Sequence, residues 1–299
     1  MILALKVDVD TYRGCREGIP KLLELFKQLD VRASFFLPHG PDNSGKAIRN
    51  LWKPSFVAKM LRTRALRLYG VRAALSGTLL PAPVLSERCL SEFRMVREAG
   101  HEVGIHGWDH RGWQDELDQW SVKRIRRELE LAANSHRAIF SEEPRSFAAP
   151  GWRVTDDALR ELDQMGLAYS SSTRHGPPFR PMVGQDALNF VEIPSTEPCP
   201  EEAQASGTEP IFPALDASET DCVVYPAHAE VEGGLLFDAF RDWLVHTLET
   251  TGACCQPLEQ VHAAIQTGNA PLSTREISLR RIPGRPTLVA SGYEESNSE

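Results

Sequence analysis

Short apolar runs alternate along this chain with longer amphipathic runs whose apolar residues recur at helical spacing. The short runs predict buried strands, and we place them at 2–9, 33–37, 103–105, 146–149, 167–171, 190–193 and 223–225. When helices alternate with strands in this way, successive strands run parallel in one sheet. The alternation therefore predicts an α/β fold whose parallel sheet forms a closed or partly closed barrel.

The 299 residues could form one large α/β domain or two small ones. We find neither an internal repeat nor a linker between two domains, so we predict one barrel over residues 1–268. Residues 41–85 interrupt the alternation between a strand and the helix that follows it, and we expect a basic helical insertion there. Periodicity is lost after Pro271, so we expect residues 269–299 to be an irregular C-terminal tail.

The composition is that of a soluble globular protein, with 41% hydrophobic and 25% charged residues and a mean hydropathy of -0.31. No apolar run approaches the roughly 18 residues that a membrane-spanning helix needs. The apolar start of the chain is short and reaches Lys6 and Asp8 without a preceding basic segment, unlike a signal peptide. We therefore expect a cytoplasmic protein. The six cysteines form no Cys-x-x-Cys pair, which disfavours a disulfide framework and a thiolate metal site.

Charge is unevenly distributed along the chain. The net charge of -8 argues against nucleic-acid binding. Residues 43–85 nevertheless contain Lys and Arg but no Asp or Glu and carry +8, which leaves -16 for the rest of the chain. Trp52, Phe56 and Leu61 are interleaved with these cations, a pattern typical of a segment that binds an anionic membrane surface. A solvated pair of basic helices packed on the barrel would give the same pattern.

Polar residues follow the predicted strands at their carboxyl ends, which meet at one rim of a barrel. His106 and His110 come directly after the strand at 103–105, and a helix starting at Gly107 would place both imidazoles on one face. Asp10 follows the first strand and can complete a set of two histidines and one carboxylate. Such a set leaves coordination positions for water and substrate, and it suits one divalent ion of Zn, Mn, Co or Fe. The alternative is a group of ordinary polar loop residues.

Asp8 lies two residues before Asp10, so both side chains of an extended chain point to the same side. One carboxylate can bind the metal while the other acts as a general base on a water molecule. His228, after the strand at 223–225, could protonate the leaving group from the opposite side. The alternatives are two aspartates that merely end a strand and a histidine that is satisfied within the core.

Further residues at the rim are candidates for substrate binding. They are Tyr12, Pro150, Gly151, Trp152, Arg153 and Arg174. His39 lies at the same rim, and we do not expect it to be a ligand. Trp108, Trp113 and Trp152 could be platforms for a sugar ring or packing residues, and the sequence leaves this choice open.

Several of these residues fall in segments that resemble the polysaccharide deacetylase (NodB-homology) family of carbohydrate esterases. The segments are 7–10, 106–110, 149–152 and 225–228, in this order. The resemblance implies a deformed, incompletely closed (β/α)7-type barrel and metal-dependent hydrolysis of N-acylated sugars. It also implies site roles, with Asp8 as the base, His228 as the acid, and Asp10, His106 and His110 as the metal ligands.

Two departures from the family pattern bear on these roles. The adjacent aspartates of the family are separated here by Val9, a spacing that we associate with its cytoplasmic branch. The family carries an arginine two residues before the proline that corresponds to Pro150, and this arginine steadies the base. Here Ala148 replaces it. Arg153, Arg145 or Arg174 could take its place, with Arg153 as the first candidate, or the role is unfilled.

Segments 6–14, 147–153 and 172–174 resemble family members that remove the formyl group from 4-formamido-4-deoxy-L-arabinose on undecaprenyl phosphate. That branch serves lipid A modification and polymyxin resistance, so the resemblance implies an undecaprenyl-phosphate-linked sugar as substrate. Since a polyprenyl lipid stays in its bilayer, it also implies peripheral association with the cytoplasmic face of the inner membrane. The alternatives are a deacetylase of another N-acylated sugar or peptidoglycan precursor, and a non-catalytic sugar-lipid binding protein.

Overall fold

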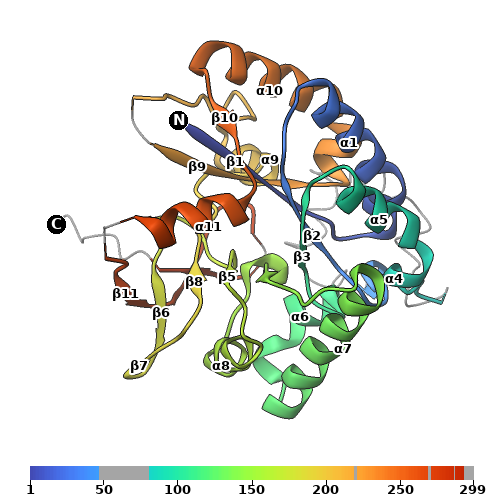
Figure 1. The fold of residues 1–299 in the computed structure, drawn as a ribbon, viewed down its shortest axis with the longest axis vertical. Helices are drawn as coiled ribbons and strands as arrows, with labels where there is room; N and C mark the ends of the chain where they lie inside the picture. Colours follow the sequence, from blue (N-terminus) through green and yellow to red (C-terminus); the bar gives the residue numbers. More distant parts are fainter. Residues whose placement is uncertain (47–80, 219–220, 269–270, 286, 293–299) are drawn as a thin grey trace.

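The computed structural model describes residues 1–46, 81–218, 221–268, 271–285 and 287–292. A parallel sheet curls through the centre of the molecule, and helices pack along its outer side (Figure 1). Within the described ranges, every helix is too short or too polar to span a membrane.

The described residues form an eight-stranded parallel sheet. Its main path, in spatial order, is β9 (Cys222–His228), β1 (Ile2–Asp8), β2 (Ser34–Leu37), β3 (Glu102–Ile105), β4 (Ser146–Phe147), β5 (Tyr169–Ser170) and β8 (Val191–Glu192). The short strand β10 (Cys254–Cys255) pairs with the first residues of β1. Among the described residues no ladder joins β8 to β9. This confirms the prediction of an incompletely closed barrel.

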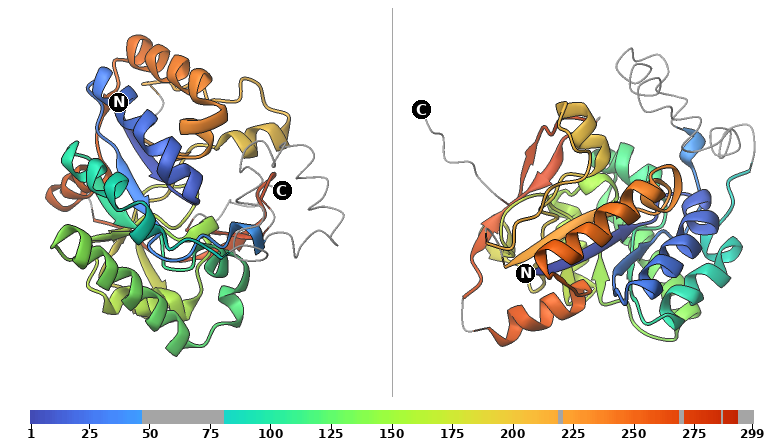
Figure 2. Two further views of the ribbon diagram at one scale, coloured as in Figure 1. Left: turned by 90° about the vertical axis from the view of Figure 1, so that its right-hand side faces the viewer. Right: turned by 90° about the horizontal axis from the view of Figure 1, so that it is seen from above.

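Helices follow most strands, as the alternation predicted. They are α1 (Ile19–Gln28), α4 (Leu85–Arg88), α5 (Leu90–Glu98), α6 (His110–Glu116), α7 (Val122–Phe140), α8 (Asp156–Gln164), α9 (Pro200–Ser206), α10 (Phe237–Thr251) and α11 (Leu258–Thr267). Ser121 and Thr155 accept backbone hydrogen bonds as the N-caps of α7 and α8. Figure 2 shows α1 beside α10 at one end of the helical layer and α7 beside α8 at the other.

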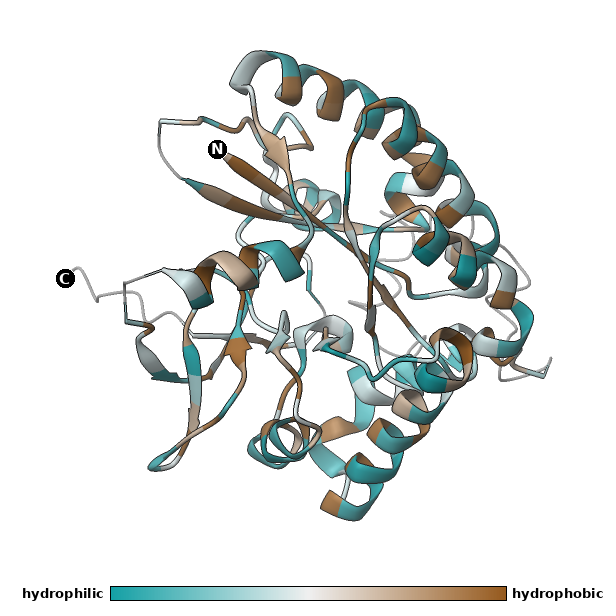
Figure 3. Cartoon of the chain, viewed as in Figure 1, coloured by the Kyte–Doolittle hydropathy of each residue, from teal (hydrophilic) through white to brown (hydrophobic). Residues whose placement is uncertain are grey.

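The side chains of β1 alternate between two environments. Leu3, Leu5 and Val7 belong to a buried apolar cluster with residues of α1 and α10. Ala4 belongs to a second cluster on the inner side of the curled sheet, which includes Phe36 of β2. Figure 3 shows the corresponding pattern, with apolar residues along the strands and polar residues on the outward faces of the helices. Since successive strand residues point to opposite faces, the even-numbered residues of β1 face the interior of the barrel.

The prediction of an irregular C-terminal tail is wrong for part of residues 269–299. Strand β11 (Thr274–Glu276) pairs with β6 (Arg180–Val183), which itself pairs with β7 (Asp186–Ala187). Strands β12 (Ser278–Arg280) and β13 (Val289–Ser291) pair with each other, and β13 is buried. These strands have three residues each, which is too short for a periodic pattern to be visible in the sequence.

The two ends of the expected insertion at 41–85 lie side by side. Pro41 and Val84 form an antiparallel bridge, and the Asp42 backbone N–H donates to Pro83 O over 2.9 Å. Residues 47–80, which carry most of the predicted basic segment, lie outside the described residues. The insertion therefore leaves and rejoins the barrel at one place, between β2 and α4.

Glu102 joins several elements at the amino ends of the strands. It is buried at the start of β3 and accepts hydrogen bonds from Ser34 Oγ (2.6 Å), Ser146 Oγ (3.1 Å), the Glu259 backbone N–H (3.0 Å) and the Tyr169 hydroxyl. One carboxylate thus connects β2, β3, β4, β5 and the first turn of α11. Buried donors of this kind need an acceptor, because an unsatisfied polar group in the core is costly.

We predict that Glu102→Ala lowers the free energy of unfolding by about 3 kcal/mol, because each buried donor left without an acceptor costs roughly 1–3 kcal/mol. Urea unfolding followed by circular dichroism measures the change. Glu98→Ala, on the exposed side of α5, is the matched control and should change stability by less than about 0.5 kcal/mol. Equal effects of the two substitutions would contradict the proposed role of Glu102.

Candidate active site

Three predicted metal ligands converge at the carboxyl ends of β1 and β3. Asp10 Oδ1 lies 3.3 Å from His106 Nε2 and 3.1 Å from His110 Nε2. The three ligand atoms lie within 4.8 Å of one another. Both histidines are buried, while Asp10 is partly exposed. The structure therefore brings together the set of two imidazoles and one carboxylate that the sequence predicted.

The local path of the chain differs from the helix that we expected to begin at Gly107. His106 follows β3 directly, and Gly107 then turns the chain with φ of +81°. Asp109 caps α6 by accepting the Gly112 backbone N–H over 2.9 Å, so His110 is the first residue of that helix. The two imidazoles thus meet across a turn, with ring centroids 4.8 Å apart, and they are not neighbours on one helical face.

Hydrogen bonding around this set fits a divalent cation. His106 Nδ1 lies 2.8 Å from Ala148 O, which requires the proton on Nδ1 and leaves a lone pair on Nε2. Asp10 Oδ1 and His110 Nε2 are buried, and beyond the contacts within this set they have no hydrogen-bond partner among the described residues. Burial opposes ionisation of Asp10, but His110 and His106 lower the pKa of its carboxyl well below the ordinary value. Three converging ligand atoms of this type suit Zn, Mn, Co or Fe.

Asp8 lies beside this set with its two carboxylate oxygens in different surroundings. Its side chain is buried, and Oδ2 accepts a hydrogen bond from Lys6 Nζ. Oδ1 is also buried and has no partner among the described residues. One oxygen is therefore held by a cation while the other remains able to accept a proton.

Lys6 is a residue that the sequence reasoning missed. The signal was present, because Lys6 is a charged residue in an otherwise apolar strand and precedes Asp8 by the two-residue period of a strand face. The first candidate for this position, Arg153, instead donates to Asp118 and to Leu288 O. The expectation that Arg153 steadies Asp8 is therefore wrong.

His228 ends β9 directly opposite Asp8 of β1 in the parallel ladder. Its ring is buried and lies edge-on to the Trp152 ring, with centroids 6.0 Å apart. Its backbone N–H donates to Glu232 Oε2 over 2.8 Å, which fixes the end of the strand. Burial lowers the pKa of His228, and a lowered pKa makes the protonated imidazole a stronger proton donor.

Trp152 is a packing residue and not an open platform for a sugar. It is 2% exposed, and its ring is approached by Lys6 Nζ at 5.1 Å, Arg174 at 4.8 Å and Arg285 at 4.3 Å. Arg174 and Arg285 both bind the Glu202 carboxylate, each over 2.6 Å. Arg285 was missed because it lies in the segment that we expected to be irregular.

The other predicted substrate-binding residues and the remaining candidate platforms differ in burial and in local structure. Tyr12 is partly buried against the cluster of β1 and α1. Pro150 is buried and Gly151 takes φ of +61°, so both serve the turn after β4. Trp113 is buried and donates from Nε1 to Arg153 O over 2.8 Å, which makes it a packing residue. Trp108 is partly buried against the apolar cluster that contains Trp113.

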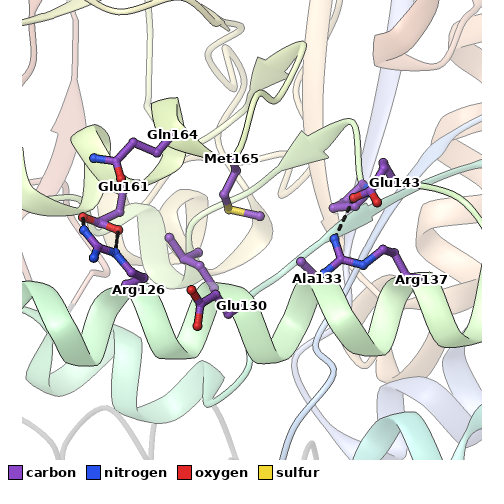
Figure 4. Close-up of a pocket in the computed structure, with 10 residues that line it drawn as sticks. Arg126, Glu130, Ala133, Arg137, Glu143, Glu161, Gln164 and Met165 are labelled. Carbon is purple, nitrogen blue, oxygen red and sulfur yellow. Dashed lines mark hydrogen bonds and ion pairs between the residues drawn. The ribbon is translucent and has the colours of Figure 1, made fainter.

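A separate groove lies between α7 and α8 (Figure 4). Arg126 binds Glu161 through two hydrogen bonds of 2.8 Å, and Arg137 binds Glu143 over 2.7 Å. None of the residues that line this groove is a predicted site residue. The groove is therefore no part of the candidate active site.

The carboxyl ends of the parallel strands carry candidate metal ligands, a carboxylate oxygen without a partner and a buried imidazole. This arrangement is typical of a hydrolase with an α/β barrel. The model of the polysaccharide deacetylase family matches residues 3–170, which is more than half of the chain. The chain therefore belongs to the polysaccharide deacetylase family.

Individual relatives agree with this assignment. A Shewanella sediminis protein named probable 4-deoxy-4-formamido-L-arabinose-phosphoundecaprenol deformylase ArnD is 34% identical over 83% of this chain and 81% of its own length. A Wigglesworthia glossinidia brevipalpis protein of the same name is 29% identical over 93% of this chain and 97% of its own. The crystal structure of a Mycobacterium smegmatis chain assigned to polysaccharide deacetylases superposes with a TM-score of 0.61. The superposition covers 93% of this chain and 94% of the Mycobacterium smegmatis chain at 16% identity, and it supports the fold.

We predict that His110→Ala lowers the affinity for Co²⁺ or Zn²⁺ by at least about 100-fold, because loss of even an indirect partner of a ligand costs roughly 10–100-fold. Competition with a metal-sensitive dye measures the affinity. His246→Ala, which removes an exposed histidine of α10, should leave it unchanged. An unchanged affinity in the His110 variant would mean that the converging side chains do not hold the metal.

Proposed function

We propose that this protein is a metal-dependent amide hydrolase that removes the formyl group from 4-formamido-4-deoxy-L-arabinose carried on undecaprenyl phosphate. The observation that carries the proposal is the convergence of Asp10, His106 and His110 beside Asp8. The substrate is suggested by the names of the two ArnD relatives, which this chain matches over most of its length. The proposal places the protein in lipid A modification and polymyxin resistance.

We assign each polar group a role in amide hydrolysis, and the geometry supports these assignments. A divalent cation held by Asp10, His106 and His110 would polarise the amide carbonyl and acidify the attacking water. Asp8 Oδ1, which has no partner among the described residues, accepts a proton from that water as it attacks the formyl carbon. Protonated His228 gives its proton to the sugar nitrogen as the C–N bond breaks. The products are formate and the free amine of the aminosugar.

Peripheral binding to an anionic membrane is part of the same proposal. The substrate lipid stays in the bilayer, so the enzyme must reach it there. The cations between Lys46 and Arg72 support this step, because each contributes about 1 kcal/mol near an anionic surface. We accordingly propose that the protein works at the cytoplasmic face of the inner membrane.

We predict that the protein releases formate from the undecaprenyl-phosphate-linked formamido-sugar and that a chelator stops the reaction. Asp8→Asn should lower turnover by about 10²–10⁴-fold, the usual contribution of a general base, while metal affinity is retained. A formate dehydrogenase assay measures the product.

Two outcomes separate the alternatives. Release of acetate from an acetylated sugar, without release of formate from the lipid-linked one, favours a deacetylase of another substrate. Binding of the sugar lipid without any turnover indicates a non-catalytic binding protein.

We predict that replacing the cations between Lys46 and Arg72 by glutamine abolishes co-sedimentation with vesicles containing phosphatidylglycerol, because the electrostatic attraction is lost. Lys123→Gln with Arg127→Gln removes exposed cations of α7 and should leave co-sedimentation intact. Equal binding of both variants would contradict a specific role for the basic segment.

A further inference from the structure

A lysine lies fully buried inside the barrel, next to the proposed base. Lys6 is 0% exposed, whereas lysine is among the residues that are almost never buried without a partner. Its ammonium group contacts the Asp8 carboxylate. Burying a cation carries a large desolvation cost, so a buried pair of this kind is weak evidence of a stabilising role.

The surroundings of Lys6 restrict where its ammonium group can lie. Nζ is 5.5 Å from the centre of the Phe36 ring on β2 and 5.1 Å from the Trp152 ring on the turn after β4. Aromatic rings at these distances attract an ammonium group. Two rings and one carboxylate, carried by different elements of the barrel, thus hold the same cation.

Other buried cations nearby have partners of their own. Arg174 donates to Glu202 Oε2 over 2.6 Å and to Glu197 O over 2.8 Å. Arg153 is bound to Asp118 and donates to Leu288 O over 3.1 Å. Of these three buried cations, Lys6 is the one that contacts Asp8.

The contact with Lys6 has a consequence for Asp8 that depends on its two oxygens. Oδ2 is held by Nζ, so rotation of the carboxylate about its axis would break a charge-assisted hydrogen bond. Oδ1 is left buried and unpaired. The lysine therefore fixes which oxygen of Asp8 faces the reaction and supplies the opposite charge that a buried carboxylate needs.

We propose that Lys6 is the positioning residue of the base, acting on the reaction through Asp8 and not through the substrate. The proposal rests on the proposed function, because it assigns a task within that reaction. It predicts an effect on kcat, since a misplaced base impairs proton removal without changing the contacts that bind the sugar.

The first test compares Lys6→Met with Lys6→Arg. Methionine fills the space between the two rings but carries no charge, so we expect kcat to fall by about 10²-fold, within the range of a general base, with KM changed by less than about threefold. Arginine restores a cation beside Asp8 and should recover kcat to within about tenfold of the original protein. Melting temperatures of both variants establish that they are folded.

The second test asks whether Lys6 acts through Asp8. In an Asp8→Asn background, Lys6→Met should lower kcat by less than about twofold further, because two residues that act as a unit are not additive. A lysine that merely fills the barrel would lower kcat by the same factor in both backgrounds. Arg126→Met breaks an ion pair between α7 and α8 and is the matched control, with kcat unchanged.

A third measurement does not depend on turnover. Lys6 does not contact the converging ligands, so Lys6→Met should bind Co²⁺ as tightly as the original protein or more tightly. Affinity weakened by more than about tenfold would show that Lys6 supports the ligands, and it would overturn the positioning role.

The outcomes separate a failure of the role proposed for Lys6 from a failure of the proposed function. Failure of the original protein to release formate overturns the proposed function and, with it, the role of Lys6 in that reaction. An undiminished kcat for formate release in Lys6→Met, or a reduced kcat that Lys6→Arg fails to restore, overturns the role of Lys6 alone.

Discussion

The register of β1 between its neighbours is the constraint on which the candidate site depends. Side chains alternate along a strand, so the register that packs Leu5 and Val7 against the helices also turns Lys6 and Asp8 into the barrel. A shift by one residue would exchange the two sets and place the charged side chains among apolar ones. The same ladder sets Asp8 opposite His228, so the proposed base and acid are positioned by backbone hydrogen bonds before any side-chain contact.

Close packing of backbone segments holds the loops beyond the strands. A Cβ atom on Gly18 would lie 2.0 Å from the carbonyl oxygen of Ala229, so the helical segment Gly14–Gly18 before α1 can approach the residue after His228 because residue 18 is glycine. The Ala148 carbonyl orients the His106 ring from a third strand end. The site is thus assembled from loops that the barrel brings to one rim.

Three buried polar atoms without a hydrogen-bond partner lie where the chemistry is proposed. Asp8 Oδ1, Asp10 Oδ1 and His110 Nε2 are all buried without a partner among the described residues. Such atoms reduce stability, and they are expected where a metal ion, water or substrate supplies the missing contact. Nearby, the buried Arg174 forms an ion pair with Glu202.

The sequence by itself determined the alternation that makes a parallel barrel, and it indicated Asp10, His106 and His110 as candidate ligands of the right chemical type at strand ends. Those features are local, because they follow from side-chain period and residue type. Tertiary structure alone decided that Arg153 binds Asp118 and not Asp8, and it brought Arg285 onto Trp152. These contacts join elements far apart in the chain, and their geometry depends on packing that no local pattern records.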